Sequence, residues 1–175
     1  MKQVYASLLD AIDGRRSPKG PTYRVNMLST TCHIYFGKML GATPNGRFAR
    51  TPQSDGTSPS HGADRCGPTA VVKSLSKMNQ IRSGGTLLNQ RFLPSVLEGD
   101  GGLEKMSKLI KTYFNLGGHH IQFNVVDTET LRMAQANPEE YRGLLVRVAG
   151  YSDYFVDLDE HHQEEIIART AQEAF

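Results

Sequence analysis

The sequence contains very little cysteine. Among its 175 residues, Cys32 and Cys66 are the only two, and tryptophan is absent. The two cysteines belong to no Cys-x-x-Cys or Cys/His spacing, which argues against a zinc or iron–sulfur site in this chain. A reducing compartment favours free thiols over a disulfide. Each cysteine is therefore predicted to pack as a small hydrophobic residue.

Long hydrophobic runs and a dominant charge are also lacking. A bilayer helix needs roughly 20 apolar residues, and the runs here are far shorter. The formal net charge is +2 with scattered basic residues, which predicts neither a nucleic-acid partner nor a membrane surface. Residues 1–3 show no secretory signal, so the expected location is the cytoplasm. With 38% hydrophobic and 22% charged residues, the composition is that of a globular domain with a real core.

Apolar spacing predicts an α/β fold. Helices are expected over 4–12, 30–40, 69–78, 103–116, 128–141 with a break at Asn137-Pro138, and in the last polar segment that ends near Thr170. Strands are expected over 23–28, 86–92, 121–126 and 144–148. Strands alternating with helices from residue 86 onward predict parallel pairing. Reactive groups in such sheets lie beyond the carboxyl ends of strands, where Gly150 follows the last one.

Two of these helices have a predicted buried face. The first would bury Val4, Leu8, Leu9 and Ile12, and the fourth would bury Leu103, Met106, Leu109, Ile110, Tyr113 and Phe114. Gly117 is expected to end the fourth helix, and Asp127 to cap the fifth.

The histidines give no metal-site pattern. His119 and His120 are neighbours before a strand, where successive side chains point to opposite faces and cannot share one ion. His161 and His162 are predicted to lie on a solvated helix face. His61, in the glycine- and proline-rich segment 51–68, is either a surface histidine or a residue that lines a cavity.

The stretch Leu144-Leu-Val-Arg-Val-Ala-Gly-Tyr-Ser152 is the most informative in the chain. By itself, Gly150 at the end of a strand indicates a turn with positive φ or a close backbone approach. The string Arg-Val-Ala-Gly-Tyr-Ser, with the aromatic patch Tyr154-Phe155-Val156 after it, resembles the C-terminal signature of the glycyl radical enzymes. This is the family of pyruvate formate-lyase and the radical dehydratases. Arg147, Tyr151 and Ser152 either fix this loop through hydrogen bonds or are ordinary strand-edge residues.

A second resemblance to the same family lies upstream. It is carried by Ala42-Thr-Pro-Asn-Gly-Arg47 and the loop that follows, which are similar to the segment before the radical domain. The segments 84–92 and 119–124 and Ala149 look more like the dehydratase branch. Within it, the enzymes of trans-4-hydroxy-L-proline are the most similar, although those of choline, glycerol, propanediol and isethionate share much of the text. Residues 1–50 would then end a barrel-type region, and residues 51–175 would form the glycine radical domain of a β/α barrel enzyme.

The resemblance implies a catalytic role for Gly150. Its α-carbon would store an unpaired electron, spread over an electron-donating amide nitrogen and an electron-withdrawing carbonyl, in a buried loop that excludes water and oxygen. No cofactor or metal is expected to bind this chain. The radical would be installed by a separate activating enzyme that carries an iron–sulfur cluster and cleaves S-adenosylmethionine.

Family members are several times longer than this chain, so Met1 is expected to mark a start inside a larger protein. The family's catalytic cysteine would lie upstream of it, which leaves Cys32 and Cys66 without that role. The chain alone is expected to store the radical without turning over the small-molecule substrate, and the whole enzyme is expected to be a homodimer.

Two other readings stay open. A stand-alone glycyl radical subunit could repair an oxygen-damaged lyase, although the additional upstream sequence counts against it. Alternatively, the chain is a plain α/β domain in which Gly150 only turns the backbone.

Overall fold

A three-stranded parallel sheet lies at the centre of the molecule, with the strand order β4-β3-β7. The computed structural model describes residues 2–175, and Met1, where a start inside a longer protein is expected, lies outside them. The central strand β3 (Asn89–Phe92) pairs in parallel with β4 (Gln122–Val125), and Asn89 lies opposite Gln122. The predicted parallel pairing of these two segments is confirmed. The third strand, β7 (Ala171–Gln172), was not predicted.

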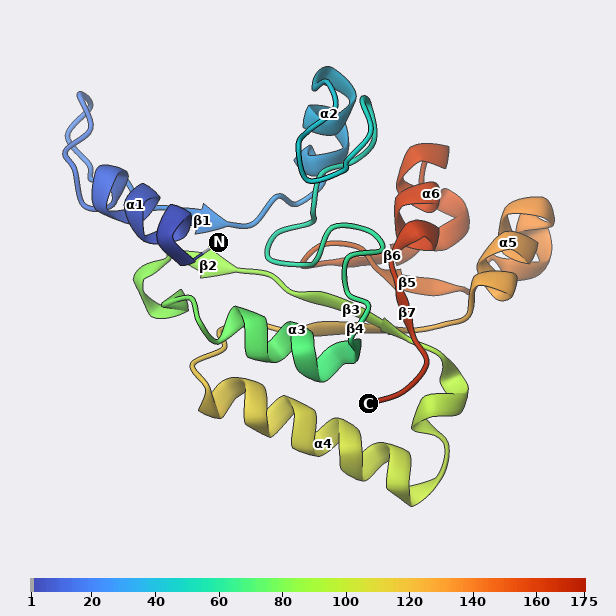
Figure 1. Cartoon of the computed structure of the whole chain (residues 1–175). Coiled ribbons are helices and arrows are strands. Elements are labelled where there is room, and N and C mark those ends of the chain that lie inside the picture. Colours follow the sequence, from blue (N-terminus) through green and yellow to red (C-terminus); the bar gives the residue numbers. More distant parts are fainter. Residues whose placement is uncertain (1) are drawn as a thin grey trace.

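Helices surround this sheet (Figure 1). They are α1 (Lys2–Ile12), α2 (Cys32–Met39), α3 (Gly67–Leu75), α4 (Gly99–Asn115), α5 (Thr128–Ala136) and α6 (Glu160–Ala168). A short parallel pair, β1 (Asn26–Met27) with β2 (Gly85–Thr86), precedes the sheet along the chain. Short 3₁₀ turns occupy Gln80–Arg82, Pro94–Leu97, Pro138–Tyr141 and Phe155–Asp157.

The expected helix ends are confirmed where local chemistry sets them. The Asp127 carboxylate accepts a hydrogen bond from the Thr130 N–H (2.6 Å), which satisfies a free donor in the first turn of α5. After α4, Gly117 takes a φ of +86°, the left-handed conformation in which glycine ends helices.

The predicted strand at 144–148 does not join the parallel sheet. Its ordered part, β5 (Leu145–Arg147), pairs antiparallel with β6 (Ser152–Tyr154) in a hairpin. The prediction of parallel pairing was wrong here because the chain reverses at Gly150, and the returning segment takes up the backbone hydrogen bonds of β5.

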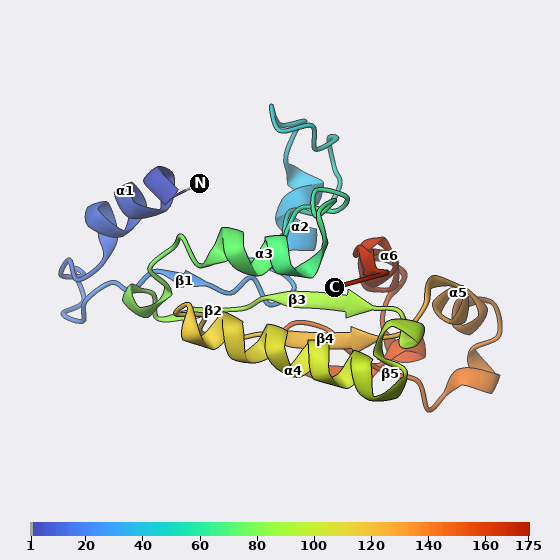
Figure 2. The same cartoon turned by 60° about the horizontal axis from the view of Figure 1, so that its bottom comes forward.

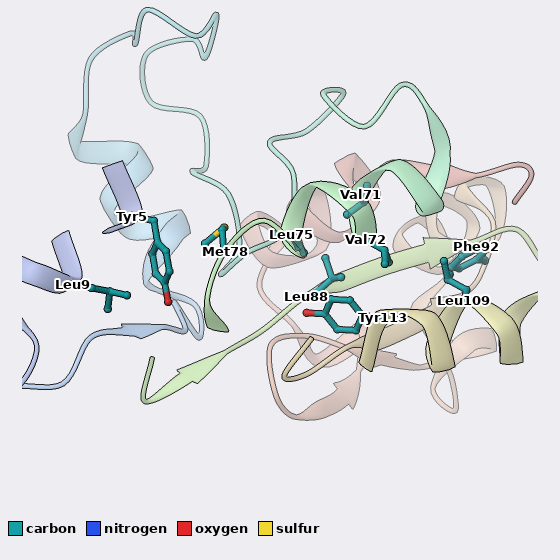
Figure 3. Close-up of a cluster of buried hydrophobic side chains, with 10 residues drawn as sticks. All are labelled: Tyr5, Leu9, Val71, Val72, Leu75, Met78, Leu88, Phe92, Leu109 and Tyr113. Carbon is teal, nitrogen blue, oxygen red and sulfur yellow. The ribbon is translucent and has the colours of Figure 1, made fainter. Parts of the chain in front are cut away.

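Two apolar clusters lie on opposite sides of β3. The first packs α1, α3 and α4 against the sheet and contains Tyr5, Leu9, Val71, Val72, Leu75, Met78, Leu88, Phe92, Leu109 and Tyr113 (Figure 3). The second joins α5, α6 and the hairpin and contains Leu87, Val126, Leu131, Ala134, Val146, Val148, Ala149, Phe155, Ile166 and Ile167. Figure 2 shows α3 and α4 lying along the strands of the sheet.

The predicted buried faces of α1 and α4 are confirmed only in part, and the predicted packing of the two cysteines was wrong. In α1 the buried residues are Tyr5 and Leu9, whereas Val4 is 74% exposed. In α4 the buried apolar side chains are Leu109 and Tyr113, and Leu103 is 62% exposed. Each helix contacts the core along a narrower stripe than its apolar pattern covers. Cys32 and Cys66 are free, as expected, but both are exposed rather than packed.

Within residues 2–175, the structure contains no helix with the length and apolar character needed to cross a membrane.

Candidate functional site

Gly150 lies at the tip of the β5–β6 hairpin. Its φ is +85°, a conformation that other residues adopt only with strain. A Cβ built on it would approach only the Leu87 Cδ1 atom, at 3.6 Å, which is an ordinary contact. The backbone conformation, rather than lack of space, therefore requires glycine here. Gly150 is exposed in this chain, so the expected buried loop is not formed by the described residues alone.

Both peptide groups that flank the Gly150 α-carbon are hydrogen-bonded to side chains. Gln122 Oε1 accepts from the Gly150 N–H (3.2 Å), and Arg147 Nη2 donates to the Gly150 carbonyl (3.1 Å). Arg147 Nε also donates to Gln122 Oε1 (2.9 Å), which links the two side chains. Arg147 Nη1 reaches Ser152 Oγ (3.3 Å) across the hairpin. Of the two readings for Arg147 and Ser152, loop fixation is therefore the one that the structure supports.

The base of the hairpin is held by side-chain amides of the central sheet. Asn124 accepts from the Arg147 N–H (2.7 Å) and donates to the Arg147 carbonyl (2.8 Å). Asn89 Nδ2 donates to the Val148 carbonyl (3.1 Å) and also to the Asp55 carboxylate. These amides replace the backbone ladder that a further sheet strand would have made. They belong to β3 and β4, so the sheet sets the position of the loop.

Arg169, at the end of α6, contributes the remaining anchors. Its guanidinium donates to the carbonyls of Arg147 (3.1 Å) and Val148 (2.9 Å) and to the Glu165 carboxylate (2.7 Å). Each of these hydrogen bonds has a charged donor, which makes it stronger than a neutral one.

A buried group of charged side chains surrounds Arg169. Burial raises the pKa of Glu165, but the imidazoles of His33 and His61, whose Nε2 atoms lie 3.5 Å and 3.3 Å from its Oε1, and the charge of Arg169 outweigh it and bring that pKa well below its usual range. Burial raises the pKa of Asp55, which is 3.8 Å from Arg169 Nη2. The two histidines and Arg169 outweigh burial at Glu165, whereas burial outweighs the charges of Arg169 and His33 at Asp55, so the pKa values of the two carboxyl groups shift in opposite directions.

Only part of this arrangement was predicted from the sequence. The residues without a predicted role in the site are Asp55, Asn89, Gln122, Asn124, Glu165 and Arg169. A signal existed in three of them, because carboxamides inside segments that otherwise read as buried strands need partners. Nothing in the sequence indicated which partners they find.

The structure places His61 beside a buried carboxylate, and His161 and His162 on α6. His61 Nε2 is 3.3 Å from Glu165 Oε1, and His61 lines an open groove of about 1030 Å³ between α2 and α6. His161 is exposed, and His162 contacts Asp159. Among the described residues, no three or more His, Cys, Asp or Glu side chains are placed to hold a metal ion.

Comparison with known proteins relates this geometry to a family. The family model described as "Glycine radical" matches residues 53–156, a range that contains Gly150 and most residues around it. Trans-4-hydroxy-L-proline dehydratase of Clostridioides difficile is 54% identical over 98% of this chain and 22% of its own length. Isethionate sulfite-lyase of Oleidesulfovibrio alaskensis is 49% identical over 95% of this chain and 21% of its own.

The fold agrees with a solved structure from the same group. The crystal structure of the Clostridioides difficile hydroxyproline dehydratase with trans-4-hydroxy-L-proline bound superposes with a TM-score of 0.93 at 53% identity, over 98% of this chain and 22% of that one. The chain spans about a fifth of the length of these relatives. Because the family model matches more than half of the chain, the chain belongs to the glycine radical family.

Proposed function

We propose that this chain is the radical-storing part of a glycyl radical enzyme of the dehydratase or lyase type, and that Gly150 carries the unpaired electron. The observation that carries the proposal is the position of Gly150. It lies inside the range that the family model matches, in the string Arg-Val-Ala-Gly-Tyr-Ser, at a hairpin tip with hydrogen bonds to both flanking peptide groups.

The chemistry requires only that the Gly150 α-carbon lose one hydrogen atom. The Cα–H bond breaks homolytically, the hydrogen leaves with one electron, and the other electron stays on carbon. Glycine suits this step because no Cβ hinders the flattening of the carbon. The partner that takes the hydrogen is an activating enzyme with an iron–sulfur cluster that cleaves S-adenosylmethionine.

The stored radical would then act on a cysteine outside this chain, and the resulting thiyl radical would attack a small-molecule substrate. Residues 1–50 are assigned to the end of the β/α barrel that holds this cysteine, and residues 51–175 to the glycine radical domain. The assembled enzyme is proposed to be a homodimer. Among substrates, trans-4-hydroxy-L-proline has the most support, since the dehydratase named for this substrate is 54% identical to this chain.

The exposed position of Gly150 supports the proposal that this chain is one part of a larger enzyme. A carbon radical open to solvent would react with oxygen. The proposal is that the rest of the enzyme covers the hairpin tip, as expected for a chain that corresponds to 22% of a relative's length.

The alternative of a stand-alone subunit that repairs a damaged lyase has less support. Identity to the hydroxyproline dehydratase extends over 98% of the chain, and so includes segments that precede the range of the family model. Specific co-purification with a lyase cleaved at its own glycine would favour the alternative.

Electron spin resonance tests the proposal. The protein, incubated without oxygen with an activating enzyme and S-adenosylmethionine, should give a doublet that collapses when glycine is deuterated at the α-carbon. Exposure to air should then cleave the chain at Gly150 and release a fragment of about residues 151–175. A competent activating enzyme that leaves the protein diamagnetic would contradict the assignment.

A further inference from the structure

We propose that Gln122 and Arg147 form a clamp that fixes both peptide groups of Gly150 while its α-carbon carries the unpaired electron. The inference rests on the proposed function and deepens it. It makes both side chains positioning residues, because they touch the peptide groups beside the reacting carbon and not the carbon itself.

The clamp contacts the two groups into which the spin spreads. Gln122 Oε1 accepts from the Gly150 N–H, which increases the electron donation of that nitrogen toward the α-carbon. Arg147 Nη2 donates to the Gly150 carbonyl, and its positive charge increases the electron withdrawal of that group. A hydrogen bond with a charged donor is stronger than a neutral one. Donation on one side and withdrawal on the other both favour the radical over the hydrogen-bearing carbon.

The clamp also provides fixed points for a change in geometry. Gly150 has a φ of +85°, and overlap of the unpaired electron with the amide nitrogen requires this angle to move toward the extended plane. This rotation turns the Gly150 carbonyl relative to its N–H, and the hydrogen bonds of Gln122 and Arg147 limit how far each group can move. The clamp therefore restricts the conformations that the flattened radical can adopt.

The orientation of the Gln122 carboxamide is determined by its neighbours. Its Nε2 donates to Asn89 Oδ1, and Asn89 Nδ2 donates in turn to the Asp55 carboxylate and to the Val148 carbonyl. The Val148 carbonyl can only accept and the Gly150 N–H can only donate, so each amide in this series has its nitrogen toward Asp55 and Val148 and its oxygen toward Gly150. Gln122 is 6% exposed and Asn89 is 7% exposed, which keeps water from competing for these bonds.

The test compares Gln122→Met with Gln80→Met. Gln80 is a matched control, because it is also a buried glutamine whose Oε1 accepts several hydrogen bonds, from Thr86, Tyr113 and the His119 N–H. Both variants lose a buried carboxamide, but only Gln122 contacts Gly150. The readouts are the α-hydrogen splitting and line width of the doublet and the anaerobic half-life of the radical, with urea unfolding of each variant as the measure of stability.

Gln122→Met is expected to broaden the doublet and shorten the radical half-life about fivefold, the rate ratio for one hydrogen bond of ordinary net strength. Gln80→Met is expected to lower stability and leave the spectrum unchanged. Gln122→Glu keeps an acceptor for Gly150 and Arg147, and should restore the half-life at least in part. Arg147→Lys keeps the charge but loses the planar fork that reaches both partners, and should broaden the doublet.

The inference is overturned if the wild-type protein gives the doublet and Gln122→Met gives the same splitting and half-life. It is also overturned if Gln80→Met changes the spectrum as much as Gln122→Met does. A wild-type protein that never gives a doublet contradicts the proposed function instead, so the two failures are distinguishable.

Discussion

The two faces of the central strand β3 are built from different chemistry. Toward α3 and α4, Phe92 and Leu88, which directly precedes β3, are fully buried in an apolar cluster with Leu109 and Tyr113. Gln90, which the alternation of the strand places on the same side, is the one buried polar residue of this face of β3. On the other face, Asn89 contacts the hairpin and Arg91 contacts the end of α6, and they are almost as deeply buried, at 7% and 3% exposure. One strand of four residues thus supports an ordinary core on one side and a polar scaffold on the other.

The polar face is a costly way to hold a hairpin. Burying a carboxamide or a guanidinium is unfavourable unless hydrogen bonds replace its water contacts. Asn89 obtains three of these, whereas Arg91 obtains two, both through Nη2 to the carbonyls of Ile167 and Arg169, and its buried Nε and Nη1 have no partner among the described residues. An apolar face of the same size would stabilise the fold more simply. The difference indicates that the apolar face provides stability, whereas the polar face determines where Gly150 and its peptide groups lie.

Gly150→Ala gives the largest expected effect, which is loss of the radical rather than loss of the fold. The radical should be absent after treatment with the activating enzyme, as measured by electron spin resonance. The Cβ meets only Leu87 at 3.6 Å, so the cost in stability is that of the left-handed backbone, about 1–2 kcal/mol.

Gly117→Ala is the matched control for this variant. Its φ is +86°, and an added Cβ would meet nothing within 4 Å. It should lose a similar free energy of unfolding and keep the doublet. If Gly117→Ala also abolished the radical, the loss in Gly150→Ala could not be assigned to the α-carbon.

Variants of the neighbouring residues Leu88 and Asn89 should show that the two faces of the sheet at β3 affect different measured properties. Leu88→Ala leaves a cavity in the apolar cluster and should lower the free energy of unfolding by about 2–5 kcal/mol, without changing the splitting of the doublet. Asn89→Ala should cost less, about 1–3 kcal/mol for the partners left unpaired, and should change the spectrum. Urea unfolding and electron spin resonance on both variants check this. Equal effects on the spectrum would contradict the division of roles.

The apolar face could be predicted from the sequence, whereas for the polar face the sequence indicated only that buried carboxamides need partners and not which partners they find. Periodic apolar residues located α3, α4, β3 and β4, since burial of such residues is dictated locally. The hairpin pairing was mispredicted because the segment 144–148 reads equally well as a parallel or an antiparallel strand, and Gly150 decides between them through its turn. Gln122 and Arg169 find their partners through contacts between residues 21 to 28 positions apart, which no local pattern encodes.

Acid should weaken the polar face before the apolar one. Contacts with the imidazoles of His33 and His61 and the charge of Arg169 hold the pKa of Glu165 well below its ordinary value of about 4.5, against the effect of burial. The ionised carboxylate therefore contributes stability at pH values above about 4.5, and this contribution is lost as the pH falls through the lowered pKa. The free energy of unfolding, measured by urea at a series of pH values, should fall on the acid side.

Glu165→Gln should reduce this fall in the free energy of unfolding at acid pH. Asp55→Asn is the control of opposite sign, because burial raises the pKa of Asp55. A raised carboxyl pKa gives stability below its ordinary value of about 3.8 that is lost as the pH rises through the raised pKa. If the free energy of unfolding of Glu165→Gln fell at acid pH as much as that of the wild type, the Glu165 carboxylate would not support the hairpin.

Leu103→Gln should have the smallest effect, although the sequence pattern places this residue on the buried stripe of α4. Its side chain is 62% exposed, whereas Leu109, six positions later, is 6% exposed. Glutamine forms helices about as well as leucine, so the change should alter the free energy of unfolding by no more than about 0.5 kcal/mol. Leu109→Gln, measured in the same urea series, should lose several times more. A large loss at Leu103 would mean that the apolar cluster extends further along α4 than the contacts of Leu109 and Tyr113 indicate.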